Sequence, residues 1–155
     1  IIVFFPAFGE EWGWRGYMMP KLTELMGKPA AIIVGGILWG LWHAPLTISG
    51  HNFGVDYNFF PWLGIVYMCV FCTFMNAFLT LLTEKTKSIY PASFCHMVNN
   101  NCGGMIFITL FGSEAFIEKI SAVNAVTLMP CMMSTSVIVG IISFILLVKK
   151  EKTQE

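Results

Sequence analysis

Three pairs of polar residues share a spacing of four positions and lie in otherwise apolar segments of the chain. They are Glu11 with Arg15, Trp39 with His43, and His96 with Asn100. Four residues place both members of a pair on one face of an α-helix, so each pair presents its side chains together. Carboxylates and imidazoles are costly to remove from water, and their presence in apolar segments predicts a buried reaction site.

The first pair assigns different roles to two neighbouring carboxylates. Glu11 can hold Arg15 in an ion pair, whereas Glu10 points about 100° around the helix and remains available for chemistry. We therefore predict that Glu10 is a general base. The alternative is a structural ion pair with no part in a reaction.

The two histidines extend the predicted site. His43 can orient or co-activate a water molecule with Glu10, because an imidazole both donates and accepts hydrogen bonds, and Trp39 would form a wall on that face. His96 and Asn100 provide two neutral donors suited to stabilising an oxyanion. The alternatives are a core histidine satisfied by its neighbours and a hydrogen-bonded pair between helices. The catalytic hypothesis predicts that Glu10, His43, His96 and Asn100 converge on one cavity.

A metal is the open alternative for this site. Glu10, His43 and His96 could form a two-histidine, one-carboxylate site for a divalent ion such as zinc. Each ligand would come from a different helix, and a glutamate with a histidine can also activate water directly. We expect catalysis without a cofactor.

Composition indicates which elements position these residues. The chain is 56% hydrophobic and 12% charged, and four stretches contain no Asp, Glu, Lys or Arg: 29–55, 57–83, 88–113 and 120–148. Each exceeds the roughly 20 residues that span hydrocarbon. We expect an all-α fold, a polytopic bundle of transmembrane helices that forms a single membrane domain over 1–155. Its core would occupy about 1–148, with a cytoplasmic tail at 149–155.

Prolines and turn residues predict the boundaries of the helices. The first helix is expected to end near Pro20, because proline lacks a backbone donor, and a polar turn would follow from Lys21 to Lys28. Pro45 deprives the Leu41 carbonyl of its helical donor and predicts a kink beside His43. The chain begins without Met in a short apolar piece, so we expect it to be the C-terminal part of a longer chain.

The loop after the kink and the lysines predict the orientation. Residues 49–59 form a polar external loop, in which His51 is expected to be solvated and to have no catalytic role. If the four spans alternate, one side carries nearly all the lysines: Lys21, Lys28, Lys85, Lys87, Lys149, Lys150 and Lys152, against Lys119 alone on the other. That side should be cytoplasmic, which predicts a plasma-membrane protein with a cytoplasmic C-terminus. Membrane lipid is the expected surrounding, and no basic stripe indicates nucleic-acid binding.

The three polar pairs together resemble the motifs of a known family. Glu10-Glu11-Trp-Gly-Trp-Arg15 resembles EExxxR, Trp39-Gly-Leu-Trp-His43 resembles FxxxH, and His96-Met-Val-Asn99-Asn100 resembles HxxxN/D of the CAAX protease and bacteriocin-processing (CPBP, or Abi) family. They occur in the family's order and cover residues 10–100. Trp39 stands where the pattern has Phe, a change that keeps an aromatic wall and affects pocket shape more than chemistry.

The resemblance implies a function and a set of roles. Family members are similar to type II CAAX prenyl endopeptidases, polytopic helical proteins whose cavity opens from the cytosolic side and within the membrane. The implied reaction is hydrolysis of a peptide bond in a membrane-associated substrate, either a prenylated C-terminal tail or a bacteriocin-like leader. The implied roles are Glu10 as base, His43 as its partner, His96 and Asn100 as oxyanion stabilisers, and Glu11 and Arg15 as structural support.

Two other functions remain open from the sequence. A non-catalytic immunity or scaffold protein could keep the pocket to bind a peptide or partner. A proton-coupled transporter would also place Glu and His residues within the membrane. A closed, one-sided cavity favours the protease, whereas a path across the membrane favours transport.

Overall fold

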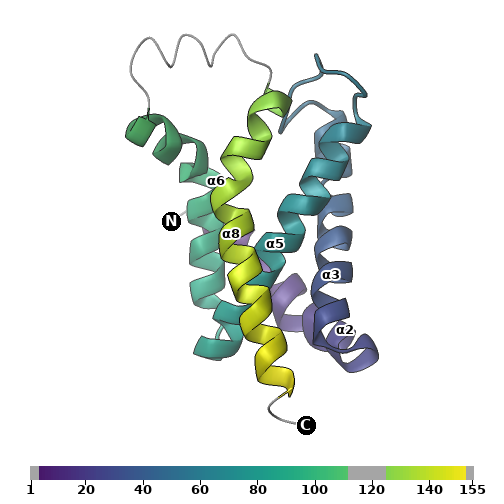
Figure 1. Cartoon of the computed structure of the whole chain (residues 1–155), viewed down its shortest axis with the longest axis vertical. Helices are drawn as coiled ribbons and strands as arrows, with labels where there is room; N and C mark the ends of the chain where they lie inside the picture. Colours follow the sequence, from purple (N-terminus) through teal and green to yellow (C-terminus); the bar gives the residue numbers. More distant parts are fainter. Residues whose placement is uncertain (1–3, 112–124, 153–155) are drawn as a thin grey trace.

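The computed structural model describes residues 4–111 and 125–152, and every regular element in these ranges is a helix. In chain order they are α1 (Phe4–Glu11), the π-helix η1 (Trp12–Met18), α2 (Met19–Met26), α3 (Lys28–Trp42), α4 (Ala44–Ile48), α5 (Trp62–Thr86), α6 (Tyr90–Phe111) and α8 (Ala125–Lys152). The long helices run side by side, and α5 packs against both α3 and α8 (Figure 1). The predicted all-α bundle is confirmed.

The described residues of all four apolar stretches are largely helical. The first is divided between α3 and α4, and the others hold α5, α6 and α8. Within the described residues, α5 and Met133–Lys150 of α8 are long and apolar enough to cross a membrane. These helices are what an integral membrane protein requires.

The predicted end of the first helix near Pro20 is wrong. The chain stays helical through Pro20 to Met26, so most of the predicted polar turn is helix. Pro20 lies at the start of α2, directly after the wider π-helical turn. The helical hydrogen bonds change register at this point, so the missing N–H of the proline costs little. The helix ends at Gly27, whose φ of 76° suits a residue without a side chain.

The predicted break before Pro45 is confirmed. Helix α3 ends at Trp42 and α4 begins at Ala44, with His43 between them. The His43 N–H donates to the Gly40 carbonyl over 3.1 Å, one residue nearer than in a regular α-helix. The break therefore places His43 at a helix end instead of within a continuous span.

Small residues bring α3 and α5 into backbone contact. A Cβ atom added at Gly36 would lie 2.3 Å from the Cα of Thr73, and one at Gly40 would lie 2.4 Å from the Cα of Cys69. Small residues allow this close approach in membrane bundles. Asn76 of α5 also donates to the Ile32 carbonyl of α3 over 2.8 Å, a hydrogen bond between helices. These contacts fix the last turn of α3, which carries Trp39, against α5.

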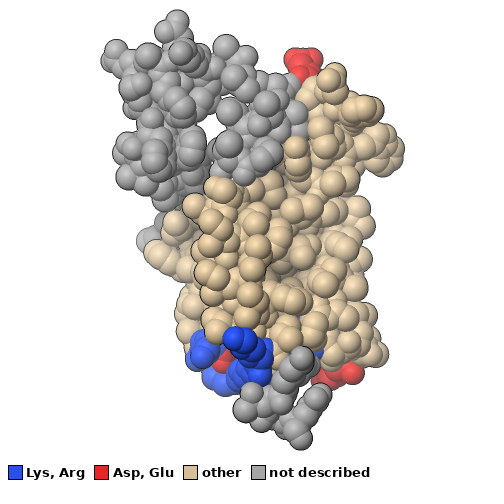
Figure 2. All heavy atoms as spheres, in the orientation of Figure 1, with Lys and Arg blue, Asp and Glu red and all other residues tan. Residues whose placement is uncertain are grey.

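The lysines of the described residues gather at one end of the bundle, called here the lysine end. They lie at the α2–α3 junction, the α5–α6 junction and the end of α8: Lys21, Lys28, Lys85, Lys87, Lys149 and Lys150. Figure 2 shows this basic group at the bottom of the view. Glu84 of α5 links three helices there, because it forms ion pairs with Lys28 of α3 at 2.9 Å and with Lys150 of α8 at 3.5 Å.

Candidate active site

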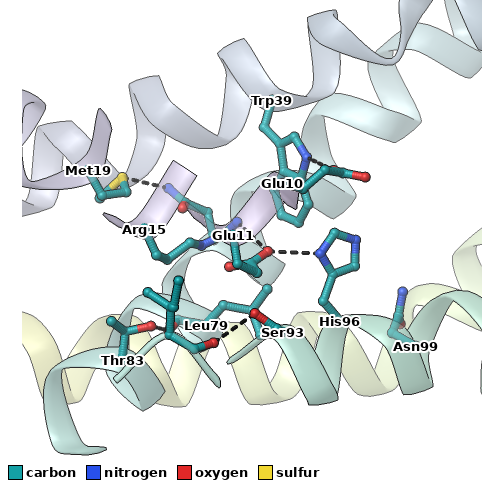
Figure 3. A network of polar contacts seen from close by, with 12 residues as sticks. Glu10, Glu11, Arg15, Met19, Trp39, Leu79, Thr83, Ser93, His96 and Asn99 are labelled. Atoms are coloured by element: carbon teal, nitrogen blue, oxygen red, sulfur yellow. Dashed lines mark hydrogen bonds and ion pairs between the residues drawn. The ribbon is translucent and has the colours of Figure 1, made fainter. Parts of the chain in front are cut away.

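A buried ion pair lies at the centre of the site. Oε1 of Glu11 accepts hydrogen bonds from Nη1 of Arg15 at 2.9 Å and from Nδ1 of His96 at 2.8 Å (Figure 3). Glu11 is fully buried, and Arg15 and His96 are nearly so. The predicted Glu11–Arg15 pair is present, and the structure adds His96 to it. The guanidinium of Arg15 also lies 4.2 Å from the centre of the Trp39 ring, within cation–π distance.

Glu10 lies apart from this buried network. Its Oε2 accepts a hydrogen bond from the indole N–H of Trp39 at 3.0 Å. Figure 3 shows the two neighbouring carboxylates pointing in different directions, as the 100° step along a helix requires. The second oxygen of Glu10 makes no hydrogen bond to the described residues, so it is available to a water molecule or a substrate.

The helix break determines how His43 presents its imidazole. Because the His43 N–H donates to Gly40, the Trp39 carbonyl is free to accept from the side chain, and Nδ1 of His43 lies 2.9 Å from it. A carbonyl oxygen only accepts, so Nδ1 carries the proton in this contact. The neutral ring then has an unprotonated Nε2, the form that can accept a proton.

Glu10, His43, His96 and Asn100 all line one cavity of about 440 Å³. The sequence prediction that these four side chains converge therefore agrees with the geometry. Helix α1 supplies the carboxylate, the end of α3 supplies His43, and α6 supplies the other two. The remaining wall is mostly aromatic and apolar, with residues Trp39, Trp42, Leu46, Met68, Phe71, Cys72 and Met133, and the polar residues are His51, Asn52 and Asn99.

The contact with Glu11 restricts what His96 can donate. Its Nδ1 lies against a carboxylate oxygen, which accepts, so the Nδ1–H points away from the cavity. A neutral His96 would then offer an acceptor at Nε2, not the neutral donor expected from the sequence. His96 can donate from Nε2 when the ring carries both protons, and Oε1 of Glu11 would then accept hydrogen bonds from two cations, Arg15 and His96.

Asn100 lies on the exposed rim of the cavity. Its Oδ1 accepts from Nδ2 of Asn99 over 3.4 Å, which leaves the Nδ2 group of Asn100 as its donor. Asn99 lines the same cavity. The amide pair therefore adds donor groups on the same wall as His96.

The structure brings three further polar residues to the cavity. His51 and Asn52 come from the turn after α4, and Asn99 comes from α6. His51 is exposed, as predicted, but it lines the cavity that the sequence did not connect with its loop. Nδ2 of Asn52 is buried without a partner among the described residues. The run of three asparagines at 99–101 could have indicated from the sequence that Asn99 belongs to the site, whereas no local pattern marks Asn52.

The described residues do not fit the metal alternative. No group of three His, Cys, Asp or Glu side chains lies close enough together in this part of the chain to hold an ion. The arrangement of the described residues therefore supports no reaction step through a metal.

Comparison with known proteins identifies relatives of the chain. The sequence profile of a family described as type II CAAX prenyl endopeptidase Rce1-like matches residues 1–102. The protein "CAAX prenyl protease 2" of Methanococcus maripaludis is 29% identical over 101 residues, which cover 64% of this chain and 37% of that protein. The chain thus spans little more than a third of this relative's length. No solved structure matches.

Proposed function

Because the chain belongs to the Rce1-like family of type II CAAX prenyl endopeptidases, a family of membrane endopeptidases, we propose that it hydrolyses a peptide bond in a membrane-associated substrate. The family resemblance inferred from the three motifs is thereby confirmed, and the chain is an integral membrane protein. The observation that carries the proposal is the convergence of Glu10, His43, His96 and Asn100 on one cavity.

In the proposed reaction, Glu10 and His43 activate a water molecule. The second oxygen of Glu10 and Nε2 of His43 are the proton acceptors that their other contacts leave available. Glu10 takes a proton from the water, and the water oxygen attacks the carbonyl carbon of the substrate. The proton then passes to the leaving nitrogen as the C–N bond breaks, which yields a carboxylic acid and an amine.

The oxyanion of the tetrahedral intermediate would be stabilised by His96 and Asn100. Nε2 of a protonated His96 and Nδ2 of Asn100 are the donors on the α6 wall. Donors that are already oriented stabilise developing negative charge without reorganisation. Glu11 orients His96 through Nδ1, so it is a positioning residue.

Arg15 and Trp39 support the site in this proposal. Arg15 neutralises Glu11 in the buried pair and lies against the Trp39 ring. Trp39 in turn donates to Glu10 and offers its carbonyl to His43, so it orients both members of the proposed water-activating pair. A Phe at this position would form the same wall but could not donate to Glu10.

The proposed substrate is a peptide held at the membrane. The name of the Methanococcus relative favours a prenylated C-terminal tail, and a bacteriocin-like leader is the alternative. The cavity favours hydrolysis over transport, because it shares no lining residue with the cavity at the lysine end within the described residues. Intact acid and histidine side chains likewise favour an enzyme over a scaffold.

The test uses the full chain in liposomes with a panel of farnesylated tails and unmodified leader peptides. Mass spectrometry would detect new peptide termini. We expect cleavage by the wild type and none by Glu10→Ala, with parallel reactions in a chelator to address the metal. Cleavage by Glu10→Ala at the wild-type rate would exclude Glu10 as the base.

A further inference from the structure

A short turn after α4, residues 49–53, contributes two consecutive polar side chains to the active-site cavity. His51 and Asn52 line the cavity next to Leu46 of α4. The loop between α4 and α5 that contains this turn lies at the top of the molecule in Figure 1. Neither His51 nor Asn52 belongs to the three sequence motifs, and the proposed hydrolysis gives neither of them a role. Their presence in the cavity wall is therefore not explained by the reaction itself.

Buried contacts hold the backbone of this turn in place. Phe53 directly follows Asn52, is only 2% exposed and packs in the same apolar cluster as Trp39. The backbone N–H of His51 donates to the Leu46 carbonyl over 3.0 Å. The turn is thus fixed on one side by the core and on the other by α4. It presents its two polar side chains to the cavity from a backbone that is already ordered.

Both side chains have hydrogen-bond donors to offer. Nδ2 of Asn52 is buried and makes no hydrogen bond to the described residues. A buried donor without a partner is unfavourable, and in native proteins such a group generally bonds to water, an ion or a ligand. The exposed imidazole of His51 has at least one N–H donor in either protonation state. Two neighbouring donors of this kind suit the two oxygens of a carboxylate.

The charges in the cavity wall restrict where a carboxylate can bind. Glu10 is the acidic residue of the lining, and within the described residues no Lys or Arg lines the cavity. A second carboxylate close to Glu10 would be repelled, because like charges interact strongly where water is excluded. The donors of the α6 wall are assigned to the oxyanion in the proposed reaction. His51 and Asn52 are therefore the donors that remain for another anionic group.

The turn also lies close to the proposed water-activating pair. Leu46 is three residues beyond His43, a rise of about 4.5 Å along a helix, and its carbonyl bonds to the backbone of His51. An extended peptide advances about 3.3–3.6 Å per residue. A peptide whose scissile carbonyl lies beside His43 would therefore reach the turn within a few residues. The anionic group that a peptide has so close to a cleaved bond, whatever its sequence, is its own C-terminal carboxylate.

We propose that His51 and Asn52 form a binding site for the C-terminal carboxylate of the peptide substrate. The imidazole N–H of His51 and Nδ2 of Asn52 donate to the two carboxylate oxygens. The site selects peptides that are cleaved a few residues before a free C-terminus, and it gives no advantage to an internal bond such as that between a leader and the protein that follows it. This inference rests on the proposed endopeptidase function.

Equilibrium binding tests the site separately from catalysis. The full chain with Glu10→Gln, which should cleave too slowly to interfere, is titrated in detergent micelles with a labelled farnesylated peptide. The peptide ends either in a free carboxylate or in a carboxamide. We expect the carboxylate form to bind about tenfold more tightly, because hydrogen bonds to a charged group are the stronger ones.

Three substitutions in this chain assign the preference to the turn. Asn52→Asp keeps the shape of the side chain but replaces its donor with a like charge, and His51→Ala removes the imidazole. Each should weaken binding of the carboxylate peptide about tenfold and change binding of the carboxamide less than about twofold. Asn58→Asp is the matched control, because Asn58 is exposed in the same loop and does not line the cavity. It should alter neither affinity.

Several results would overturn the carboxylate site. They are equal affinities for the two peptides, binding of neither peptide, an equal loss of both affinities in His51→Ala and Asn52→Asp, and a loss in Asn58→Asp as large as in Asn52→Asp. Failure of the proposed function gives a different result. Preference for the carboxylate peptide without cleavage by the wild type would overturn hydrolysis and support the site, whereas cleavage of both peptides with the same kcat/KM would support hydrolysis and overturn the site.

Discussion

Removal of the Glu11 carboxylate should be the most destabilising single charge deletion at this site. Glu11→Ala would leave the guanidinium of Arg15, which is 3% exposed, buried without its ion-pair partner. Breaking a buried pair in this way costs about 3–5 kcal/mol. The Lys21–Glu24 pair provides the matched control, because its side chains are 57% and 65% exposed. An exposed pair contributes about 0–1 kcal/mol, so Glu24→Ala should change little.

The measurement is thermal unfolding of the protein in detergent micelles, followed by tryptophan fluorescence. For a chain of this size 1 kcal/mol shifts Tm by about 2–4 °C, so Glu11→Ala should unfold about 6–20 °C below the wild type. Glu11→Gln keeps an oxygen acceptor for Arg15 and His96 and should lie between the two variants. A Tm for Glu11→Ala within about 2 °C of that for Glu24→Ala would refute the buried ion pair as a stabilising element.

Three further substitutions test other contacts of the bundle. Gly40→Ala should cost about 1–3 kcal/mol, because its Cβ would collide with the Cα of Cys69, whereas Gly13→Ala meets no atom within 4 Å and should be neutral in the same unfolding assay. Trp39→Phe removes the indole donor to Glu10 and should slow peptide cleavage about tenfold. The effect stays modest because water can replace the lost hydrogen bond at this partly exposed carboxylate. A decrease in cleavage rate as large as that of Glu10→Gln would contradict this expectation. Thr80→Val removes a buried hydroxyl without a hydrogen-bond partner among the described residues. The free energy of unfolding should stay unchanged or rise by about 1 kcal/mol, measured in the same unfolding assay. A clear decrease in Tm would show that the hydroxyl makes a hydrogen bond.

The spacing of the polar residues predicted much of the site. A separation of four residues on a helix correctly paired Glu11 with Arg15, and the step of 100° correctly directed Glu10 elsewhere. The break at Pro45 followed from the missing backbone donor of proline. These features depend on geometry within one helix, which a sequence pattern contains.

The sequence pattern could not predict contacts between helices. The bond from His96 to Glu11 joins residues 85 positions apart, and it changes which nitrogen of His96 faces the cavity. The turn with Asn52 reaches the cavity because the chain reverses direction after α4 toward the antiparallel helix α5, which no local spacing indicates. Pro20 was misjudged because a π-helical turn before it accommodates the missing donor. Each of these features depends on tertiary packing or on a rare backbone form.

The convergence of His43 and His96 on one cavity also required the structure. A rise of about 1.5 Å per residue separates His43 from Lys28 by about 22 Å and His96 from Lys87 by about 13 Å, which corresponds to different depths in straight, parallel helices. The structure nevertheless brings both to one cavity, with the rings of Trp39 and His96 5.2 Å apart. The relative tilt and offset of helices, set by packing such as that of Gly36 and Gly40 against α5, decide this convergence.

A double-mutant cycle on the rate of peptide cleavage tests most directly whether Glu10 and His43 act on one water molecule. Glu10→Gln and His43→Ala should each lower kcat by about 10²–10⁴, because each removes a proton acceptor from the same step. If they act as a unit, the double variant should be no slower than the slower single variant. Rate losses that multiply in the double variant, or cleavage by Glu10→Gln within about tenfold of the wild type, would contradict the proposed mechanism.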